Sequence, residues 1–419
     1  MANSRRIVVV GGGVIGLSTA YFCARAGHRV TVLDRQPERR DGCSFGNAGM
    51  VVPSHFIPLA APGMVALGLR WMGNPESPFY IRPRLDRELL SWGWKFWRSS
   101  TAAHVRRSAP LLRDLSLASR EAFAELAAEP GNDFGFVPRG LLMLCRTEHA
   151  LAEEARTAGQ ARELGLPAEV LDPAQAAALD PDVRMRVAGA VYYPRDCHLA
   201  PDRFMAALHR QVEALGGTFR WETPVTGWKL AGGGVRAVQT GSGDIEGDEF
   251  VLCGGAWSPG VAEELGLELP LQAGKGYSLT LTRPRQLPRL CAIFTEARVA
   301  VTPMGSTLRF GGTLEIAGLN EDINPVRVRG IIRSVPGYYP DFQPEDFAGI
   351  QPWRGLRPCS PDGLPYVGRP RRYGNLVVAT GHAMMGLSLA PITGRVVAAL
   401  VSGTSPSFDL SLLSPDRFA

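Results

Sequence analysis

The sequence predicts an α/β protein in which a discontinuous Rossmann-like domain is joined to a substrate domain with a mainly antiparallel sheet and helices. Two observations predict this fold class. The chain begins with a strand, a glycine-rich turn, a helix and a second strand, and a strand, turn and helix return near its C-terminal end. At 419 residues the chain is also too long for one ordinary compact core, which favours two domains.

The N-terminal unit has the pattern of a βαβ motif. Residues 6–10 end in an apolar run that is typical of a strand buried on both faces of a parallel sheet. Residues 14–26 predict a helix, and Gly27 follows where a left-handed C-terminal cap is expected. Residues 28–34 predict the second strand and complete the unit.

The middle of the chain departs from this pattern. Residues 53–113 are rich in Pro, Trp and Arg and contain no second βαβ unit. Later β-type runs predict an antiparallel sheet that faces the substrate, and they cover residues 140–145, 190–193, 272–281, 297–303 and 308–313.

Elements of the first domain recur later in the chain. We expect helices at 201–215 and 261–265, strands at 218–221 and 250–253, a meander between 225 and 250, and a last strand and helix at 375–380 and 386–402. The Rossmann-like domain is therefore predicted to comprise residues 1–55, 196–270 and 346–419. The substrate domain is predicted to comprise residues 56–195 and 271–345.

Composition excludes several classes of protein. The formal net charge is +5, and no long basic block stands apart from acidic residues, so nucleic-acid binding is not expected. The 7 cysteines never form a CxxC pair, which argues against structural disulfides and a zinc site, and no metal ligand is predicted. The apolar run 7–17 holds four glycines and lacks a cleavage site, so we expect a cytoplasmic protein rather than a secreted one.

The strongest chemical signal is the turn that contains Gly11, Gly13 and Gly16 between the first strand and the first helix. Its glycines permit a tight turn and close approach of the backbone to a pyrophosphate, whose charge then lies at the helix N-terminus. Asp34, at the end of the second strand, stands near the position expected for an acid that binds a ribose hydroxyl. The sequence therefore predicts a dinucleotide site, without distinguishing NAD from FAD.

Two further loops suit a flat ring bound beyond the diphosphate. Residues 41–50 are small and polar, and residues 380–388 form a glycine-containing turn before the last helix. A helix N-terminus there could stabilise negative charge on a reduced flavin. Taken singly, the first segment favours an ordinary loop, and the second favours a plain helix start.

Taken together, these segments carry a resemblance. Five motifs occur in one order: residues 11–16, 44–49, 275–278, 353–358 with 361–365, and 381–386. In this order they resemble the FAD-dependent D-amino acid oxidase superfamily, and within it the bacterial D-amino acid dehydrogenases most closely. The resemblance covers essentially the whole chain and implies FAD as the cofactor.

The resemblance also implies a set of residues that hold FAD. They are Gly11, Gly13, Val14, Ile15, Gly16, Asp34, Arg35, Ser44, Asn47, Ala48, Gly49, Met50, Val225, Gly254, Trp257, Gly381, His382, Met385, Gly386, Leu387 and Ser388.

The catalytic residues are expected around the flavin ring. The resemblance places Arg357 on the substrate carboxylate, for which a planar guanidinium is well suited. Lys275 and Tyr277 are expected on a strand that faces the flavin. His55 and His382 either border the active site or are structural histidines, and no catalytic base is assigned. A compact aromatic pocket is expected from Met50, Phe310, Tyr338 and Tyr339.

The function implied is oxidation of a D-amino acid by hydride transfer from Cα to flavin N5. The product imine would hydrolyse to a 2-oxo acid and ammonia, and D-proline or 4-hydroxy-D-proline would suit the compact pocket. Electrons would pass to a quinone or a dye. The alternatives are a glycine- or sarcosine-type oxidase that produces hydrogen peroxide, a flavin electron-transfer subunit without turnover, and, last, an NAD-dependent dehydrogenase.

Residues 91–97 combine three Trp with neighbouring cations. Two interpretations stay open. The segment is either an interfacial helix that contacts anionic lipid, or a set of aromatic side chains packed under the substrate domain. The first would fit a peripheral protein on the inner face of the cell membrane, because similar dehydrogenases pass electrons to a membrane quinone.

Overall fold

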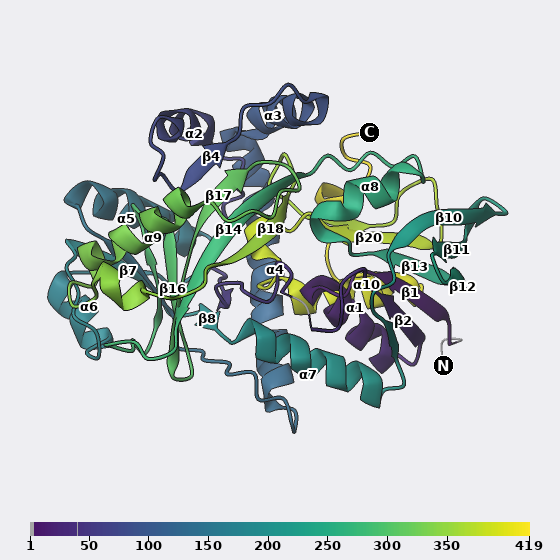
Figure 1. Ribbon diagram of the computed structural model, residues 1–419, viewed down its shortest axis with the longest axis horizontal. Coiled ribbons are helices and arrows are strands. Elements are labelled where there is room, and N and C mark those ends of the chain that lie inside the picture. The colour runs from purple at the N-terminus through teal and green to yellow at the C-terminus, as the bar shows by residue number, and fades with distance from the viewer. Residues whose placement is uncertain (1–3, 40) are drawn as a thin grey trace.

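The computed structural model describes residues 4–39 and 41–419, so residues 1–3 and residue 40 of the predicted first segment lie outside the described residues. Two large sheets lie at opposite sides of the molecule, and long segments of the chain pass between them (Figure 1). This arrangement is the mixed α/β fold that the sequence predicts.

The first sheet contains the N-terminal βαβ unit. Its order is β19-β20-β13-β1-β2-β9, and all neighbours are parallel except β19 and β20. The strands are β1 (Arg6–Val10), β2 (Arg29–Leu33), β9 (Thr218–Arg220), β13 (Glu249–Leu252), β19 (Tyr366–Gly368) and β20 (Leu376–Thr380).

Both faces of this sheet are covered, which explains the apolar composition of β1. Ile7 and Val9 join the core beneath the helices α1 (Val14–Arg25), α7 (Pro201–Ala214) and α10 (Ala390–Val401). The side chains of Val8 and Val10 point to the other face, because successive strand residues alternate. There they pack with the meander β10 (Val225–Ala231), β11 (Gly234–Thr240) and β12 (Gly243–Glu246), near α8 (Ser258–Glu263).

The second sheet is larger and mainly antiparallel. Along its main path the order is β18-β14-β17-β16-β15-β5-β7-β6, and β4 pairs with β17. The strands are β4 (Phe79–Ile81), β5 (Leu141–Cys145), β6 (Glu169–Leu171), β7 (Gly189–Tyr193), β14 (Gln272–Leu281), β15 (Cys291–Phe294), β16 (Val299–Met304), β17 (Thr307–Ile316) and β18 (Trp353–Cys359).

Helices and short elements complete the fold. Helices α2 and α3 protrude at the top of Figure 1, whereas α4 runs behind the junction of the two sheets. Strand β3 (Met50–Val51) pairs with β8 (Cys197–His198). The remaining helices are α2 (Met64–Met72), α3 (Arg87–Ser99), α4 (Ala102–Ala128), α5 (Glu148–Glu163), α6 (Pro173–Leu179) and α9 (Pro325–Tyr338). The short 3-10 helices are η1 (Gly255–Trp257), η2 (Pro344–Phe347), η3 (Ala383–Met385) and η4 (Ser411–Leu413).

Two sequence expectations about elements need correction. The last helix begins at Ala390 and not at residue 386, because residues 383–385 form a separate 3-10 turn. Pro391 lies in the first turn of the helix, where the backbone N–H that proline lacks would have no partner within the helix. Strand β18 has no counterpart among the predicted strands, and it contains a proline, which is unusual in a strand. Pro358 is tolerated because β18 lies at the edge of its sheet.

Within residues 4–39 and 41–419, no helix combines the length and the apolar character that are needed to cross a membrane. Helix α3 presents a mixed surface instead. Trp92 is buried and donates from Nε1 to the carbonyl of Cys359 at 2.9 Å, whereas Trp94 and Trp97 are 50% and 63% exposed. One tryptophan therefore packs under the helix and two face outward.

Candidate active site

The glycine turn after β1 lines a first cavity of about 240 Å³, called here the nucleotide cavity. Gly11 has a φ of 110°, and a Cβ on Gly16 would lie 1.8 Å from the Gly11 carbonyl oxygen, so neither position accepts a side chain without distortion. The backbone N–H of Gly12 donates to Asp34 Oδ2 at 2.6 Å. The turn and the acid of β2 are thus held together at the carboxyl edge of the sheet.

Most of the predicted cofactor residues line this cavity. Arg35 lies over the ring of Trp257 at 3.8 Å, and the N–H of Val14 donates to Ser44 Oγ at 3.1 Å. The predicted residues that line it are Gly11, Gly13, Val14, Ile15, Asp34, Arg35, Ser44, Asn47, Val225, Gly254, Trp257, His382, Gly386 and Leu387.

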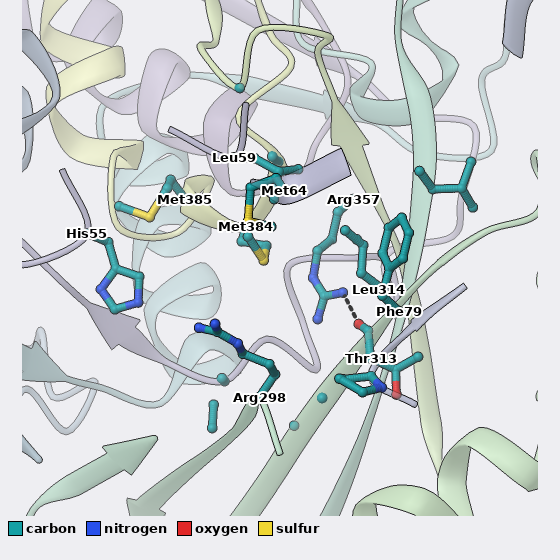
Figure 2. Close-up of a pocket in the computed structure, with 18 of the residues that line it drawn as sticks. His55, Leu59, Met64, Phe79, Arg298, Thr313, Leu314, Arg357, Met384 and Met385 are labelled. Carbon is teal, nitrogen blue, oxygen red and sulfur yellow. Dashed lines mark hydrogen bonds between the residues drawn. The ribbon is translucent and has the colours of Figure 1, made fainter. Parts of the chain in front are cut away.

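A second, larger cavity of about 500 Å³, the inner cavity, adjoins the first. Cys43, Asn47, His382 and Ala383 line both, so the two spaces form one elongated site between the two sheets. Ala48, Met50 and Met385, from the predicted cofactor set, line the inner cavity. Its walls are mainly apolar, and Figure 2 shows Leu59, Met64, Met384 and Leu314 around it.

Four predicted cofactor residues support the walls without lining them. A Cβ on Gly16 would meet the glycine turn, and Gly49 and Gly381 have φ values of 76° and 77°, which suit glycine. Ser388 Oγ accepts a hydrogen bond from the N–H of Val52 at 3.0 Å, which ties the last turn to the chain after β3.

Arg357 is the strongest candidate for carboxylate binding. It lies on β18, and its Nη1 donates to the carbonyl oxygen of Thr313 at 2.7 Å, which holds the guanidinium in the inner cavity (Figure 2). Gly276 on β14 makes room for it, because a Cβ there would lie 2.2 Å from both terminal nitrogens. Strand order therefore brings together three residues that the sequence separates by up to 81 positions, from 276 to 357.

His55 also lines the inner cavity, and a hydrogen-bonded chain runs behind it. Its Nδ1 lies 3.0 Å from Ser54 Oγ, and Ser54 donates from its N–H and Oγ to Asp196 at 3.0 and 2.5 Å. When Asp196 is ionised, both Ser54 groups donate to it, so Ser54 Oγ accepts the proton of His55 Nδ1. The lone pair of the neutral imidazole is then on Nε2.

Burial shifts the titration of both ends of this chain. Burial lowers the pKa of His55 to about 4, and the nearby charge of Arg298 contributes in the same direction. Burial raises the pKa of Asp196 to about 7, opposed by its two hydrogen bonds from Ser54. His55 is therefore neutral at pH 7.

His382 lies at the junction of the two cavities. Its Nε2 is 3.0 Å from Thr393 Oγ1, whereas its buried Nδ1 has no hydrogen-bond partner within the described part of the chain. Burial lowers the pKa of His382 to about 3, so the ring is neutral. An unpaired buried ring nitrogen at this point is a group that a bound ligand can satisfy.

The structure does not bring all the predicted catalytic residues into the site. Lys275 projects from β14 away from the inner cavity, and its Nζ donates to Asn320 Oδ1 at 2.8 Å and to the Asp322 carbonyl at 2.6 Å. Tyr277 borders the cavity, but its hydroxyl donates to Glu315 Oε2 at 2.6 Å. The physical reason is that successive side chains of a strand point to opposite faces. Gly276 lies on the face of β14 that Arg357 covers, so the neighbouring Lys275 points to the other face.

The expected aromatic pocket is also absent from the inner cavity as described. Tyr338 stacks on Phe294 with ring centroids 4.2 Å apart and donates its hydroxyl to Glu296 at 2.6 Å. Phe310 and Tyr339 belong to the same buried core of the second sheet. Of the four residues expected there, Met50 alone lines the cavity. Aromatic composition does not distinguish a core from a binding pocket, and the structure places Phe310, Tyr338 and Tyr339 in the core.

Sequence reasoning missed other cavity residues. Arg298, Thr313 and Met384 point into the space that Arg357 borders (Figure 2). Arg298 lies in the turn between β15 and β16, which the sequence did not resolve because β15 was not anticipated. Gly276 had a usable signal, since a glycine inside a strand often marks close approach by another group.

Comparison with known proteins decides the family. Residues 6–400 match the family model described as FAD dependent oxidoreductase. The chain belongs to this family. It is therefore an FAD-dependent oxidoreductase, and its cofactor is FAD.

Relatives over the full length carry a more specific name. A D-amino acid dehydrogenase of Methylobacterium radiotolerans is 37% identical over 99% of both chains, and one of Bradyrhizobium diazoefficiens is 33% identical over 99% of both. Among solved structures, glycine oxidase from Geobacillus kaustophilus matches with a TM-score of 0.79 at 24% identity, covering 99% of this chain and 100% of that one. L-proline dehydrogenase from P. horikoshii matches with a TM-score of 0.76 at 18% identity, covering 100% and 98%.

The residues of the two cavities fit FAD. Glycines that exclude a Cβ lie where a diphosphate needs close backbone contact, and the Arg35–Trp257 pair offers a flat surface. The unpaired His382 Nδ1 lies where the nucleotide cavity meets the inner cavity. The elongated shape suits a dinucleotide whose reactive ring borders the inner cavity.

Proposed function

We propose that this FAD-dependent oxidoreductase is a D-amino acid dehydrogenase that oxidises the Cα–N bond of its substrate. The observation that carries the proposal is the guanidinium of Arg357, held over Gly276 in an apolar cavity that adjoins the nucleotide cavity. A planar fork of this kind binds a carboxylate through two parallel hydrogen bonds. The names of the full-length relatives support the D configuration.

FAD, held by the residues of the nucleotide cavity, would supply the oxidising chemistry as the acceptor of the hydride from Cα. Arg357 fixes the carboxylate, and with it the direction of the Cα–H bond, an orientation effect that can lower a barrier by several kcal/mol, roughly 7–11 at most. The apolar walls exclude water and disfavour an ammonium, so they favour the neutral amine that the oxidation requires.

We infer that His55 assists loss of the amine proton. Its neutral Nε2 can accept this proton, while Ser54 and Asp196 hold the ring in the required tautomer. Because the pKa of His55 is about 4, the proton must pass on to solvent rather than remain there. The contribution is therefore modest, about tenfold, which is below the roughly 100–10,000-fold that general bases typically provide.

The outward-facing tryptophans of α3 support a proposal about the electron acceptor and the location of the protein. We propose that electrons pass to a membrane quinone and that α3, with Trp94 and Trp97, contacts anionic lipid. Arg98 lies over the ring of Trp94 at 4.9 Å and matches the charge of such a surface, whereas Lys95 is ion-paired with Glu268. Sedimentation of the holoenzyme with anionic vesicles tests the contact, and reduction of a soluble quinone analogue tests the acceptor.

A dye-reduction panel tests the reaction. The holoenzyme should reduce an artificial dye with several D-amino acids and not with their L-enantiomers. D-proline and 4-hydroxy-D-proline belong in the panel, although the compact aromatic pocket expected for them does not line the cavity. Activity with glycine or sarcosine alone, accompanied by rapid peroxide formation, would contradict the proposal and support an amine oxidase. Flavin bleaching without turnover to any acceptor would support an electron-transfer subunit.

A further inference from the structure

The inner cavity has an unusual charge distribution. Its lining contains two side chains that are charged at neutral pH, Arg357 and Arg298, and no Asp, Glu or Lys within the residues described. Arg357 has a hydrogen-bond acceptor in Thr313. Arg298 forms neither a hydrogen bond nor an ion pair within residues 4–39 and 41–419. A site with one cation would suffice for a substrate with one carboxylate.

Arg298 reaches this cavity from a separate part of the fold. It ends the turn between β15 and β16, and Figure 2 shows its guanidinium in the cavity on the side of His55, across from Arg357. The two arginines thus approach the same space from different strands. A ligand that filled the space would meet one cation at each end.

The backbone of Arg298 is held in a conformation that disfavours its residue type. Its φ is 53°, in the left-handed region, where Gly or Asn is normally more stable than a residue with a long side chain. Strained positions of this kind cluster at ligand sites. The backbone conformation and the unpaired guanidinium are independent features of one residue. Arg298 therefore combines two properties of a ligand-binding residue at the wall of the inner cavity.

The surrounding acids leave this cation available. Glu154 feels the charge of Arg298, but its carboxylate accepts a hydrogen bond from Tyr193 at 3.3 Å, and no ion pair joins it to Arg298. His55 is neutral and offers no negative charge. A negative group that enters the cavity therefore meets no acid that is already ion-paired with Arg298 within the described residues.

We propose that Arg298 determines specificity by binding a second carboxylate, carried on the side chain of an acidic D-amino acid. Arg357 binds the α-carboxylate, and Arg298 binds the side-chain carboxylate. This inference rests on the proposed function, because it names the substrate class of the same site. Arg298 remains exposed to solvent, so its contribution is screened and is expected to be about 2–5-fold.

Acid and amide pairs of equal shape test the inference. For the holoenzyme, kcat/KM in dye reduction is measured with D-glutamate against D-glutamine and with D-aspartate against D-asparagine. The wild type should favour at least one acid over its amide by about 2–5-fold. Equal values within both pairs, with turnover of D-alanine intact, would overturn the inference while leaving the proposed function in place.

Variants of Arg298 sharpen the test. Arg298→Met should bring the ratio of kcat/KM for the acid to that for the amide to about 1, whereas Arg298→Lys should retain most of the preference. Arg329→Met is the matched control, because Arg329 is exposed on α9 and does not line the cavity. An equal loss for acids, amides and D-alanine in Arg298→Met would assign Arg298 a structural role and overturn the inference.

Two further measurements separate the possible outcomes. Binding of glutarate, followed by the change in flavin absorbance of the holoenzyme, should be tighter than binding of its half-amide in the wild type and not in Arg298→Met, which reports on Arg298 without turnover. If no D-amino acid is oxidised, the proposed function fails, yet this binding measurement still tests the second site. Iminodiacetate carries its second carboxylate on the nitrogen, so a preference for it over D-glutamate would overturn the side-chain assignment.

Discussion

The nucleotide cavity is shaped largely by the backbone around one short glycine turn, whereas the inner cavity is lined by side chains from strands and loops far apart in sequence. In the first, the positions of Gly11 and Gly16 follow from local sterics, since a Cβ at either would meet another backbone atom. In the second, Arg357 reaches its position because β18 pairs with β14 and leaves Gly276 beneath the guanidinium. A local motif therefore predicts the cofactor site better than it predicts the substrate site.

The largest effect is expected at the glycine turn. Gly16→Ala places a Cβ 1.8 Å from the Gly11 carbonyl, so the turn must open and the protein should purify without flavin. Absorbance of the flavin per mole of protein measures this, and a loss of activity of about 100-fold or more should accompany it. Gly260→Ala is the control, because nothing lies within 4 Å of a Cβ there. A fully flavin-loaded Gly16→Ala protein would show that local sterics do not control this cavity.

The next largest effect is expected at Arg357. Arg357→Met should leave flavin content unchanged and lower kcat/KM by about 100–1000-fold, because the carboxylate loses its bidentate partner. Arg357→Lys should recover only part of this, since an ammonium cannot form the same fork. If flavin is lost together with activity, the two cavities are not functionally separate, and the comparison between them fails. Arg333→Met on the surface of α9 serves as the control.

A smaller, pH-dependent effect is expected at His55. His55→Phe should lower kcat/KM by about tenfold at pH 7, where the substrate amine must lose a proton, and by little near pH 10, where the amine is already neutral. The wild-type profile should show no break from His55 between pH 6 and 9, because the pKa of His55 is about 4. A loss that is constant across the pH range would indicate packing rather than proton transfer.

Asp196, which lies behind His55 of the inner cavity, should make the folding stability of the protein depend on pH. Its pKa in the folded protein is about 7, above the usual range, so the folded state retains a proton that the unfolded state has lost. The contribution of Asp196 to the free energy of unfolding therefore falls by at most about 4 kcal/mol as the pH rises from about 4 to about 7. Above pH 7 this contribution is constant. Asp196→Asn should have a thermal midpoint that rises relative to wild type between pH 5 and pH 8. A constant difference in midpoint across this range would show that Asp196 does not titrate there.

The smallest effect is expected on the outer surface of α3. Replacement of Trp94 and Trp97 by Ser should lower the fraction of holoenzyme that sediments with anionic vesicles by about 3–10-fold and leave dye reduction unchanged. Leu230→Ser is the control, because Leu230 is 49% exposed on β10 and lies on a different element. Equal sedimentation of both variants and the wild type would exclude this surface as the lipid contact.

The sequence by itself determined the features that depend on local backbone geometry. It predicted β1, α1 and β2 to within a residue or two, the acid at Asp34, and the order of motifs that led to FAD. It also identified Arg357 and His55 as residues worth attention, and both line the inner cavity. These signals were readable because glycine conformation, helix capping and strand periodicity act over a few residues.

The tertiary structure alone decided which side chains share the inner cavity. Lys275 and Gly276 are adjacent in sequence, yet strand alternation sends one to a buried polar cluster and leaves the other beneath Arg357. Tyr338 had the composition of a pocket residue and became part of a core, whereas Arg298 had no distinguishing pattern and became a second cation at the site. Such contacts depend on strand pairing between residues far apart, and the pattern of any one segment does not contain that information.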